Sequence, residues 1–217
     1  MEEPIRVLVV DDHFVVRKGV LALLVDASGI EVVGEASDGQ EAVEAVRRLS
    51  PQVILMDLKL PRLDGVAATR AILAERPKVG IVALTGTDVE EEVLAAVHAG
   101  ALGYLAKTAP REDFAEAIRR VARGEIWLSP HLTARLLTHL RPGSRPEPPE
   151  ALTEREREIV VRIARGWSNR RIGQELHISE KTVRTHVSHI LEKLGVSNRV
   201  EAALHAVRSG MASLKDL

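Results

Sequence analysis

The first 125 residues alternate short β-branched runs with longer segments of helical periodicity, and this alternation restricts the possible folds more than any other feature. Near-continuous apolar runs, typical of strands buried on both faces, occur at 5–10, 30–36, 53–56, 79–84 and 104–106. Helical segments lie at about 14–25, 39–49, 65–75, 88–99 and 111–123, with Asp38 and Asp88 at N-cap positions and Gly100 and Gly124 at helix ends. The pattern predicts an α/β fold with an open, doubly wound, five-stranded parallel sheet, whose functional residues gather at the carboxyl ends of the strands.

Acidic residues, a threonine and a lysine fall at these strand ends. Asp11 and Asp12 follow the first strand and Asp57 ends the third, and these strands are neighbours in a doubly wound sheet. Clustered carboxylates repel one another unless a cation neutralises them, and the hard, oxygen-seeking Mg²⁺ suits them best. Thr85 after the fourth strand and Lys107 after the fifth add a hydroxyl and an ammonium. This edge could therefore hold a phosphoryl group, with Asp57 as the nucleophile.

Each of these residues alone also has a structural explanation, since an Asp pair can cap a helix and a lysine can be a solvated charge. The prediction rests on the agreement of four strand ends. A flavin or nucleotide site would need Gly, Ser or Thr after the first strand, where two aspartates repel an anion. A metal-dependent phosphatase using Asp57 would need a substrate pocket and an acid placed to protonate the leaving group.

The segment 141–150 contains four prolines, one glycine and no apolar side chain, which is typical of a semi-rigid linker. A short helix is expected just before it, with one apolar side made of Leu132, Leu136, Leu137 and Leu140. We therefore expect a first domain at 1–124, a linker with a short helix at 125–150 and a second domain at 151–217. The net charge is −6 for residues 1–125 and +5 for residues 126–217, so the total of −1 is the sum of an acidic and a basic part.

The basic part has four helical segments and no strand pattern. A capping box at 153–156 starts the first helix, the second covers about 168–176, Ser179 caps a third that ends at Leu194, and the last covers about 198–208. The third helix has an apolar stripe of Val183, Val187, Ile190, Leu191 and Leu194, with Lys181, Arg184, Thr185 and Ser188 opposite. This is the layout of a helix-turn-helix reading helix, although periodicity alone favours a solvated amphipathic helix.

Two sets of residues resemble known families. Over about residues 4–124 the chain resembles the receiver domain of two-component response regulators, a flavodoxin-like fold, through Asp11, Asp12, Asp57, Thr85, Tyr104 and Lys107. The strings at 152–156, 166–169, 179–186 and 193–196 look like the LuxR-type helix-turn-helix. The whole chain is therefore similar to a NarL/FixJ-type response regulator.

For the acidic site, the resemblance implies phosphorylation by a histidine kinase on Asp57. Mg²⁺ would be held by Asp12, Asp57 and the backbone carbonyl of Lys59, assisted by Asp11. Thr85 and Tyr104 would form a switch pair, in which the hydroxyl turns toward the phosphoryl group and the ring moves inward. Such a protein catalyses only its own phosphoryl transfer and dephosphorylation and is not otherwise an enzyme. A constitutive regulator whose receiver only mediates protein contacts is the main alternative.

For the basic domain, the resemblance implies contacts with double-stranded DNA from Lys181, Thr182, Arg184, Thr185 and Ser188. The last helix carries an apolar stripe that consists of Val200, Ala203, Leu204 and Val207. This stripe either completes the core or, as the resemblance implies, forms the contact of a homodimer that binds two-fold symmetric half-sites. Gly173 stands where relatives usually have Ala, and costs about 1 kcal/mol in helix propensity, so a slightly loose second helix is expected.

Composition excludes several other classes of protein. The absence of cysteine excludes disulfide scaffolds, Cys-ligated zinc, iron–sulfur clusters and thiol nucleophiles. The acidic start of the chain is unlike a secretory signal, and no apolar run approaches the roughly 20 residues of a membrane helix. A cytoplasmic protein without a membrane partner is therefore expected.

Overall fold

The computed structural model describes residues 3–86, 90–128, 133, 136 and 151–213. By their contacts, the residues form two compact units, Met1–Arg123 and Gly124–Leu217. The predicted N-cap Asp88, three of the four leucines of the predicted short helix and the segment 141–150 lie outside the described residues. None of the helices in the described ranges is long and apolar enough to cross a membrane.

The first unit contains the predicted five-stranded parallel sheet, in the order β2-β1-β3-β4-β5. Its strands are β1 (Ile5–Val10), β2 (Ile30–Ala36), β3 (Val53–Asp57), β4 (Gly80–Thr85) and β5 (Gly103–Ala106). Every residue of β3 and β4 is buried, which agrees with their continuous apolar sequences. Because β1 pairs directly with β3, the residues that follow Val10 and Met56 meet at one edge of the sheet.

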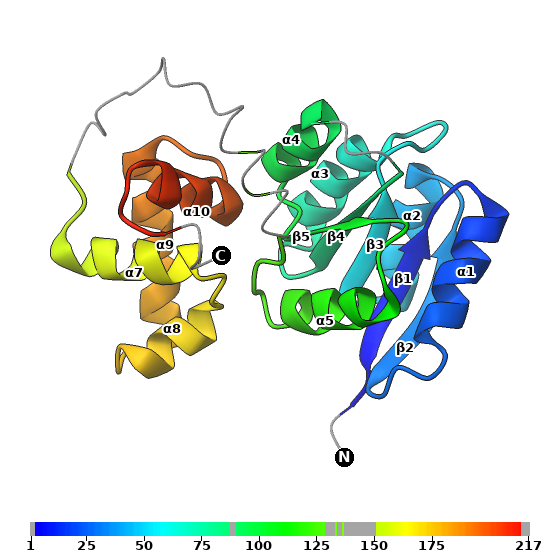
Figure 1. Cartoon of the computed structure of the whole chain (residues 1–217), viewed down its shortest axis with the longest axis horizontal. Helices are drawn as coiled ribbons and strands as arrows, with labels where there is room; N and C mark the ends of the chain where they lie inside the picture. The colour runs from blue at the N-terminus through cyan, green and yellow to red at the C-terminus, as the bar shows by residue number, and fades with distance from the viewer. Residues whose placement is uncertain (1–2, 87–89, 129–132, 134–135, 137–150, 214–217) are drawn as a thin grey trace. The chain divides into compact units, whose positions relative to one another are not determined.

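Helices cover both faces of this sheet. They are α1 (Phe14–Leu24), α2 (Gly39–Leu49), α3 (Gly65–Glu75), α4 (Glu90–Ala99) and α5 (Arg111–Ala122). Figure 1 shows α1 and α5 on one face and α2, α3 and α4 on the other. The Asp38 side chain accepts hydrogen bonds from two backbone N–H groups of α2, so this predicted N-cap is confirmed. Gly100 and Gly124 have positive φ angles, which end α4 and α5.

Over residues 151–213, the second unit contains four helices: α7 (Glu154–Ala164), α8 (Asn169–Glu175), α9 (Glu180–Leu194) and α10 (Arg199–Arg208). The predicted capping box between Thr153 and Glu156 is present, Ser179 caps α9, and Gly195 ends α9 in the left-handed region. Residues 125–128, which the sequence analysis assigns to the linker, belong to this unit, and Ile126 is only 2% exposed.

Gly173 brings α8 close to the turn that precedes α9. A Cβ atom at this position would lie 2.7 Å from the carbonyl oxygen of Ile178. The N–H of Ile178 donates to the carbonyl of Gly173 at 2.9 Å, which holds the two segments together. The expectation of a slightly loose second helix stays a prediction, but the missing side chain permits a close connection to the next turn that propensity alone does not consider.

Candidate functional site

The carboxyl ends of β1 and β3 bring Asp11, Asp12 and Asp57 together. A ligand atom from each of them, with one from His13, lies within 4.8 Å of the others. Asp11 and Asp57 are buried, whereas Asp12 lies exposed at the rim of the cluster. Three carboxylates thus share a small volume at the edge where the sequence places them.

Lys107 supplies the positive charge nearest to the two buried carboxylates. Its Nζ atom lies 2.7 Å from Oδ2 of Asp11 and 2.7 Å from Oδ2 of Asp57. The backbone N–H of Lys107 donates to the carbonyl of Thr85 at 2.8 Å, which fixes the lysine just after β5. Burial acts to lower the pKa of Lys107, but its close contacts with the Asp11 and Asp57 carboxylates outweigh this effect and raise the pKa. The ammonium therefore remains charged at neutral pH.

The loop after Asp57 folds back tightly against the end of β3. The N–H of Gly65 donates to the carbonyl of Leu58 at 3.1 Å, and a Cβ atom on Gly65 would lie 1.9 Å from the carbonyl oxygen of Asp57. Only glycine can occupy that position without moving the backbone. Burial raises the pKa of the Asp57 carboxyl above its ordinary value, although Lys107 acts in the opposite direction.

The loop after β1 orients the other two carboxylates. The N–H of His13 donates to Oδ1 of Asp11 at 2.8 Å, and its Nδ1 lies 2.6 Å from Oδ1 of Asp12. Arg17 donates to the carbonyl of Asp11 at 2.6 Å, a contact that the sequence did not predict. Within the described residues, Oδ2 of Asp11 accepts no well-aligned hydrogen bond. A buried carboxylate oxygen in this state, in a cluster of hard oxygen ligands, fits a divalent cation such as Mg²⁺.

Thr85 and Tyr104 lie on the strands next to this cluster. Thr85 ends β4 and is buried, and Tyr104 on β5 pairs with Ala83 of β4. The ring of Tyr104 is 3% exposed, and its hydroxyl has no hydrogen-bond partner in the described part of the chain. Burial raises the pKa of Tyr104 well above its ordinary value, so the hydroxyl stays protonated. The tyrosine that the sequence assigns to a switch is thus inside the fold in this structure.

In the second unit, the exposed face of α9 is basic and rich in hydroxyl groups. Its apolar side is buried through Val183, Val187, Ile190 and Leu194, as the stripe predicts. The five predicted DNA-contact residues are all exposed: Lys181, Thr182, Arg184, Thr185 and Ser188. The Thr185 hydroxyl donates to the carbonyl of Lys181, and the Ser188 hydroxyl donates to that of Arg184. The helix itself therefore orients these two hydroxyls, beside two cationic side chains.

The predicted dimer face on α10 is largely internal. Val200, Ala203 and Leu204 are at most 1% exposed, and α10 packs against α7 and α9. Only Val207 of this stripe is partly exposed. The stripe therefore completes the core, and its assignment as a dimer contact is corrected for the three buried residues.

Comparison with known proteins agrees with both units. Residues 7–119 match the response regulator receiver domain family, and residues 150–206 match the bacterial regulatory proteins of the luxR family. The chain is 45% identical to the transcriptional regulatory protein LiaR of Bacillus subtilis, over 96% of this chain and 100% of LiaR. The chain belongs to the response regulator family.

Solved structures of response regulators agree with this assignment. The crystal structure of ChrA, from a heme-sensing two-component system, is 38% identical and covers 97% of this chain and 100% of ChrA, with a TM-score of 0.55. A structure of RcsB dimers bound to DNA is 25% identical and covers 95% of this chain and 99% of RcsB, with a TM-score of 0.56. The chain is thus a response regulator with a receiver domain and a LuxR-type DNA-binding domain, an architecture of transcription regulation.

One ion pair of the DNA-binding domain, between Lys193 and Glu156, was not predicted. Lys193 near the end of α9 lies 2.9 Å from Oε2 of Glu156, and the same carboxylate accepts a hydrogen bond from the backbone of Thr153. This contact fastens α9 to the start of α7. The capping box gave a reason for Glu156 to be a helix cap, but nothing in the sequence pointed to a partner 37 residues away.

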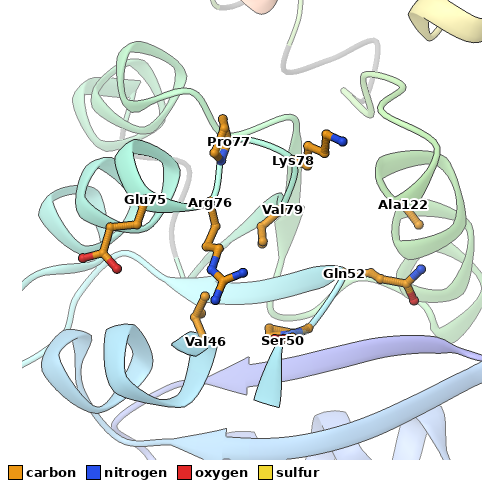
Figure 2. A pocket seen from close by; sticks show the side chains of 10 residues that line it. Val46, Ser50, Gln52, Glu75, Arg76, Pro77, Lys78, Val79 and Ala122 are labelled. Atoms are coloured by element: carbon orange, nitrogen blue, oxygen red, sulfur yellow. The ribbon is translucent and has the colours of Figure 1, made fainter. Parts of the chain in front are cut away.

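A separate hollow of about 420 Å³ lies at the opposite end of the receiver sheet (Figure 2). It is lined by residues at the ends of α2 and α3 and at the start of β3, and the guanidinium of Arg76 points into it. The hollow contains none of the clustered acidic residues. It therefore offers no substrate pocket for a phosphatase reaction at Asp57.

Proposed function

We propose that this response regulator is phosphorylated on Asp57 by a sensor histidine kinase, and that phosphorylation controls its binding to DNA and thereby transcription. The main support is the buried Asp57 carboxylate, placed 2.7 Å from the Lys107 ammonium among clustered acids at the end of β3. A buried carboxylate beside a fixed cation is suited to act as a nucleophile toward a phosphoryl group. Its partner would be a kinase of the two-component type, the class of system named for ChrA.

In the transfer, a carboxylate oxygen of Asp57 forms a bond to phosphorus, and the bond from phosphorus to the imidazole nitrogen of the kinase phosphohistidine breaks. The Lys107 ammonium already contacts Asp57 and can stabilise the charge of the phosphoryl oxygens. The Thr85 hydroxyl, at the next strand end, would donate to the phosphoryl group. The buried ring of Tyr104 on β5 would shift in response, and this shift would change the surface near β5. Such a change is expected because a new local charge biases a two-state element.

The same cluster would hold Mg²⁺ through the carboxylates of Asp11, Asp12 and Asp57 and the backbone carbonyl of Lys59. The hard oxygen ligands and the unaligned Oδ2 of Asp11 fit this ion. When bound, Mg²⁺ neutralises the carboxylates and the incoming phosphoryl charge. Arg17 and the backbone of His13 keep Asp11 in place.

In the DNA-binding domain, α9 would enter the major groove with Lys181, Thr182, Arg184, Thr185 and Ser188 facing the DNA. Lys181 and Arg184 would supply attraction to phosphates, and the hydroxyls would contact bases or phosphates. The DNA-bound RcsB dimers support a homodimer on two-fold symmetric half-sites. On α10, Val207 is the residue of the predicted stripe that is exposed enough to contact a second chain. We place the protein in the cytoplasm, with the DNA and the kinase's catalytic domain.

Intact-mass measurement of the chain treated with acetyl phosphate and Mg²⁺ tests the phosphorylation site. We expect one phosphoryl group per chain, and none on Asp57→Asn. Asp64→Asn is the matched control, because Asn can keep the N-cap that Asp64 makes on α3. Equal labelling of wild type and Asp57→Asn would exclude Asp57 as the acceptor.

Footprinting tests whether phosphorylation controls DNA binding, on DNA that the wild-type chain has selected from a random pool. Phosphorylation should change the affinity of the wild type and not that of Asp57→Asn. An unchanged affinity of the fully phosphorylated wild type would instead support a constitutive regulator, whereas continuous turnover of phosphomonoesters would support a phosphatase.

A further inference from the structure

The segment Gly124–Leu128 directly follows α5 but is a part of the DNA-binding domain. Gly124 ends α5 with a φ of 74°, and the second compact unit begins at this residue. Glu125, Ile126 and Leu128 are 6%, 2% and 6% exposed. A segment with this burial is packed into a core and does not behave as a solvated linker.

Ile126 is attached to the turn that starts the helix-turn-helix. Its backbone N–H donates to the carbonyl of Gly166 at 3.1 Å. Gly166 follows α7, and two residues later Ser168 caps α8 through the N–H of Arg171. Ile126 is thus hydrogen-bonded to the backbone two residues before the cap of α8.

A partly buried arginine also holds this turn. The Arg199 guanidinium, at the start of α10, donates to the carbonyl of Trp167 and to the side chain of Asn169. Burial lowers the pKa of Arg199 to about 10, and the negative charge of Glu125 acts in the opposite direction. The negative charge of Glu125, in the same segment as Ile126, thus acts favourably on the cation that holds the start of α8.

We propose that Gly124–Leu128 is the positioning element through which the receiver acts on the helix-turn-helix. This proposal rests on the proposed function, because it names the route by which phosphorylation would reach DNA binding. The two compact units share one covalent crossing, between Arg123 and Gly124, and the proline-rich segment 141–150 comes later in the chain. Only Gly124 and Glu125 separate the end of the receiver from Ile126, which is hydrogen-bonded to the turn before α8. A shift at the end of α5 would therefore act on this turn without passing through a flexible linker.

Insertions in the full-length chain test this route. Gly-Ser-Gly placed after Gly124 preserves the cap of α5 but adds slack before Glu125, and the same insertion after Gly143 is the matched control. DNA affinity is measured by fluorescence anisotropy, on a duplex selected with the wild-type chain, before and after treatment with acetyl phosphate. Intact mass confirms that each variant is phosphorylated equally.

We expect the insertion after Gly124 to reduce the phosphorylation-dependent change in affinity to less than about twofold, with the unphosphorylated affinity unchanged. The insertion after Gly143 should retain the full change. A full response with slack after Gly124, or a loss of response in both variants, overturns the proposal. If the wild type is phosphorylated and does not respond, the proposed function itself fails.

Amide exchange of Ile126 tests the docking without any phosphorylation. Ile163→Val weakens the core of the DNA-binding domain and Ile118→Val weakens that of the receiver, each by one methylene at a residue with no exposure. If the segment belongs to the DNA-binding domain, Ile163→Val should accelerate exchange at Ile126 by about fivefold, and Ile118→Val should not. The opposite pattern would show that the segment is part of the receiver and would overturn the proposal.

Discussion

Replacing Lys107 by Ala should destabilise the receiver by about 3 kcal/mol in the absence of divalent cations. The side chain of Lys107 is 16% exposed, and those of Asp11 and Asp57 are 0% and 4% exposed, so solvent screens the contacts weakly. A charge-assisted hydrogen bond to Asp57, of about 1.5–3 kcal/mol, and an ion pair to Asp11 are lost, and two buried carboxylates are left to repel each other. Breaking a buried charge pair in this way costs about 3–5 kcal/mol. Part of this loss is recovered because the ammonium no longer has to be desolvated. The net destabilisation should therefore lie near the lower end of this range.

The same substitution should cost only about 1.5 kcal/mol in the Asp57→Asn background, because one charged contact of the lysine is then absent. Calorimetric unfolding of the full chain in EDTA, with the two units followed as separate transitions, measures all four members of the cycle. Lys59→Ala is the control, since its Nζ pairs with Glu92 at 2.9 Å but its side chain is 67% exposed, and the expected cost is at most about 0.5 kcal/mol. If Lys107→Ala costs the same in the wild-type chain and in the Asp57→Asn variant, the lysine does not act through this carboxylate and the electrostatic argument is wrong.

Three further outcomes are expected. Burial acts to raise the pKa of Glu156, but hydrogen bonds from Thr153 and Lys193 outweigh this effect and lower the pKa. The stabilisation that Glu156 gives the fold is therefore present above the unfolded pKa of about 4.3, and it is lost as the pH falls through the folded pKa. Glu156→Gln should therefore destabilise the DNA-binding domain to urea at pH 7 and have little effect in acid; an equal effect at every pH would contradict this. Arg184→Ala should weaken DNA binding and reduce the slope of log affinity against log salt by about 0.9, and an unchanged slope would exclude a phosphate contact. Asp12→Asn should weaken Mg²⁺ binding in titration calorimetry while Asp64→Asn does not, because only the former removes a carboxylate from the cluster.

The sequence predicted the helices, strands and acidic cluster because each depends on local or topological information. The cap at Asp38 and the left-handed Gly195 are local signals, and the meeting of Asp11 with Asp57 follows from the order of parallel strands. These features need no knowledge of side-chain packing. The fold and the centre of the candidate site could therefore be predicted from residue types alone.

Contacts between elements that are far apart in the sequence could not be predicted in the same way. An apolar stripe shows which side of α10 is apolar, but it cannot show that α10 packs against two other helices and that Leu204 is only 1% exposed. The role of Gly173 depends on a carbonyl oxygen that only the folded turn brings near. Arg199, after a helix cap, looks like a solvated charge until its hydrogen bonds to Trp167 and Asn169 are known.

The placement of the aromatic residues gives each domain its own optical signal. Both tryptophans of the chain, Trp127 and Trp167, lie in the DNA-binding unit, whereas the single tyrosine, Tyr104, lies in the receiver. The guanidinium of Arg171 lies 4.2 Å from the centre of the Trp167 ring, directly beside the turn that starts α8. Fluorescence excited at the red edge, where tyrosine does not absorb, therefore comes from the DNA-binding unit alone in the unlabelled protein. If phosphorylation of Asp57 acts on the DNA-binding domain as proposed, the tryptophan signal can follow it without a dye or an introduced cysteine.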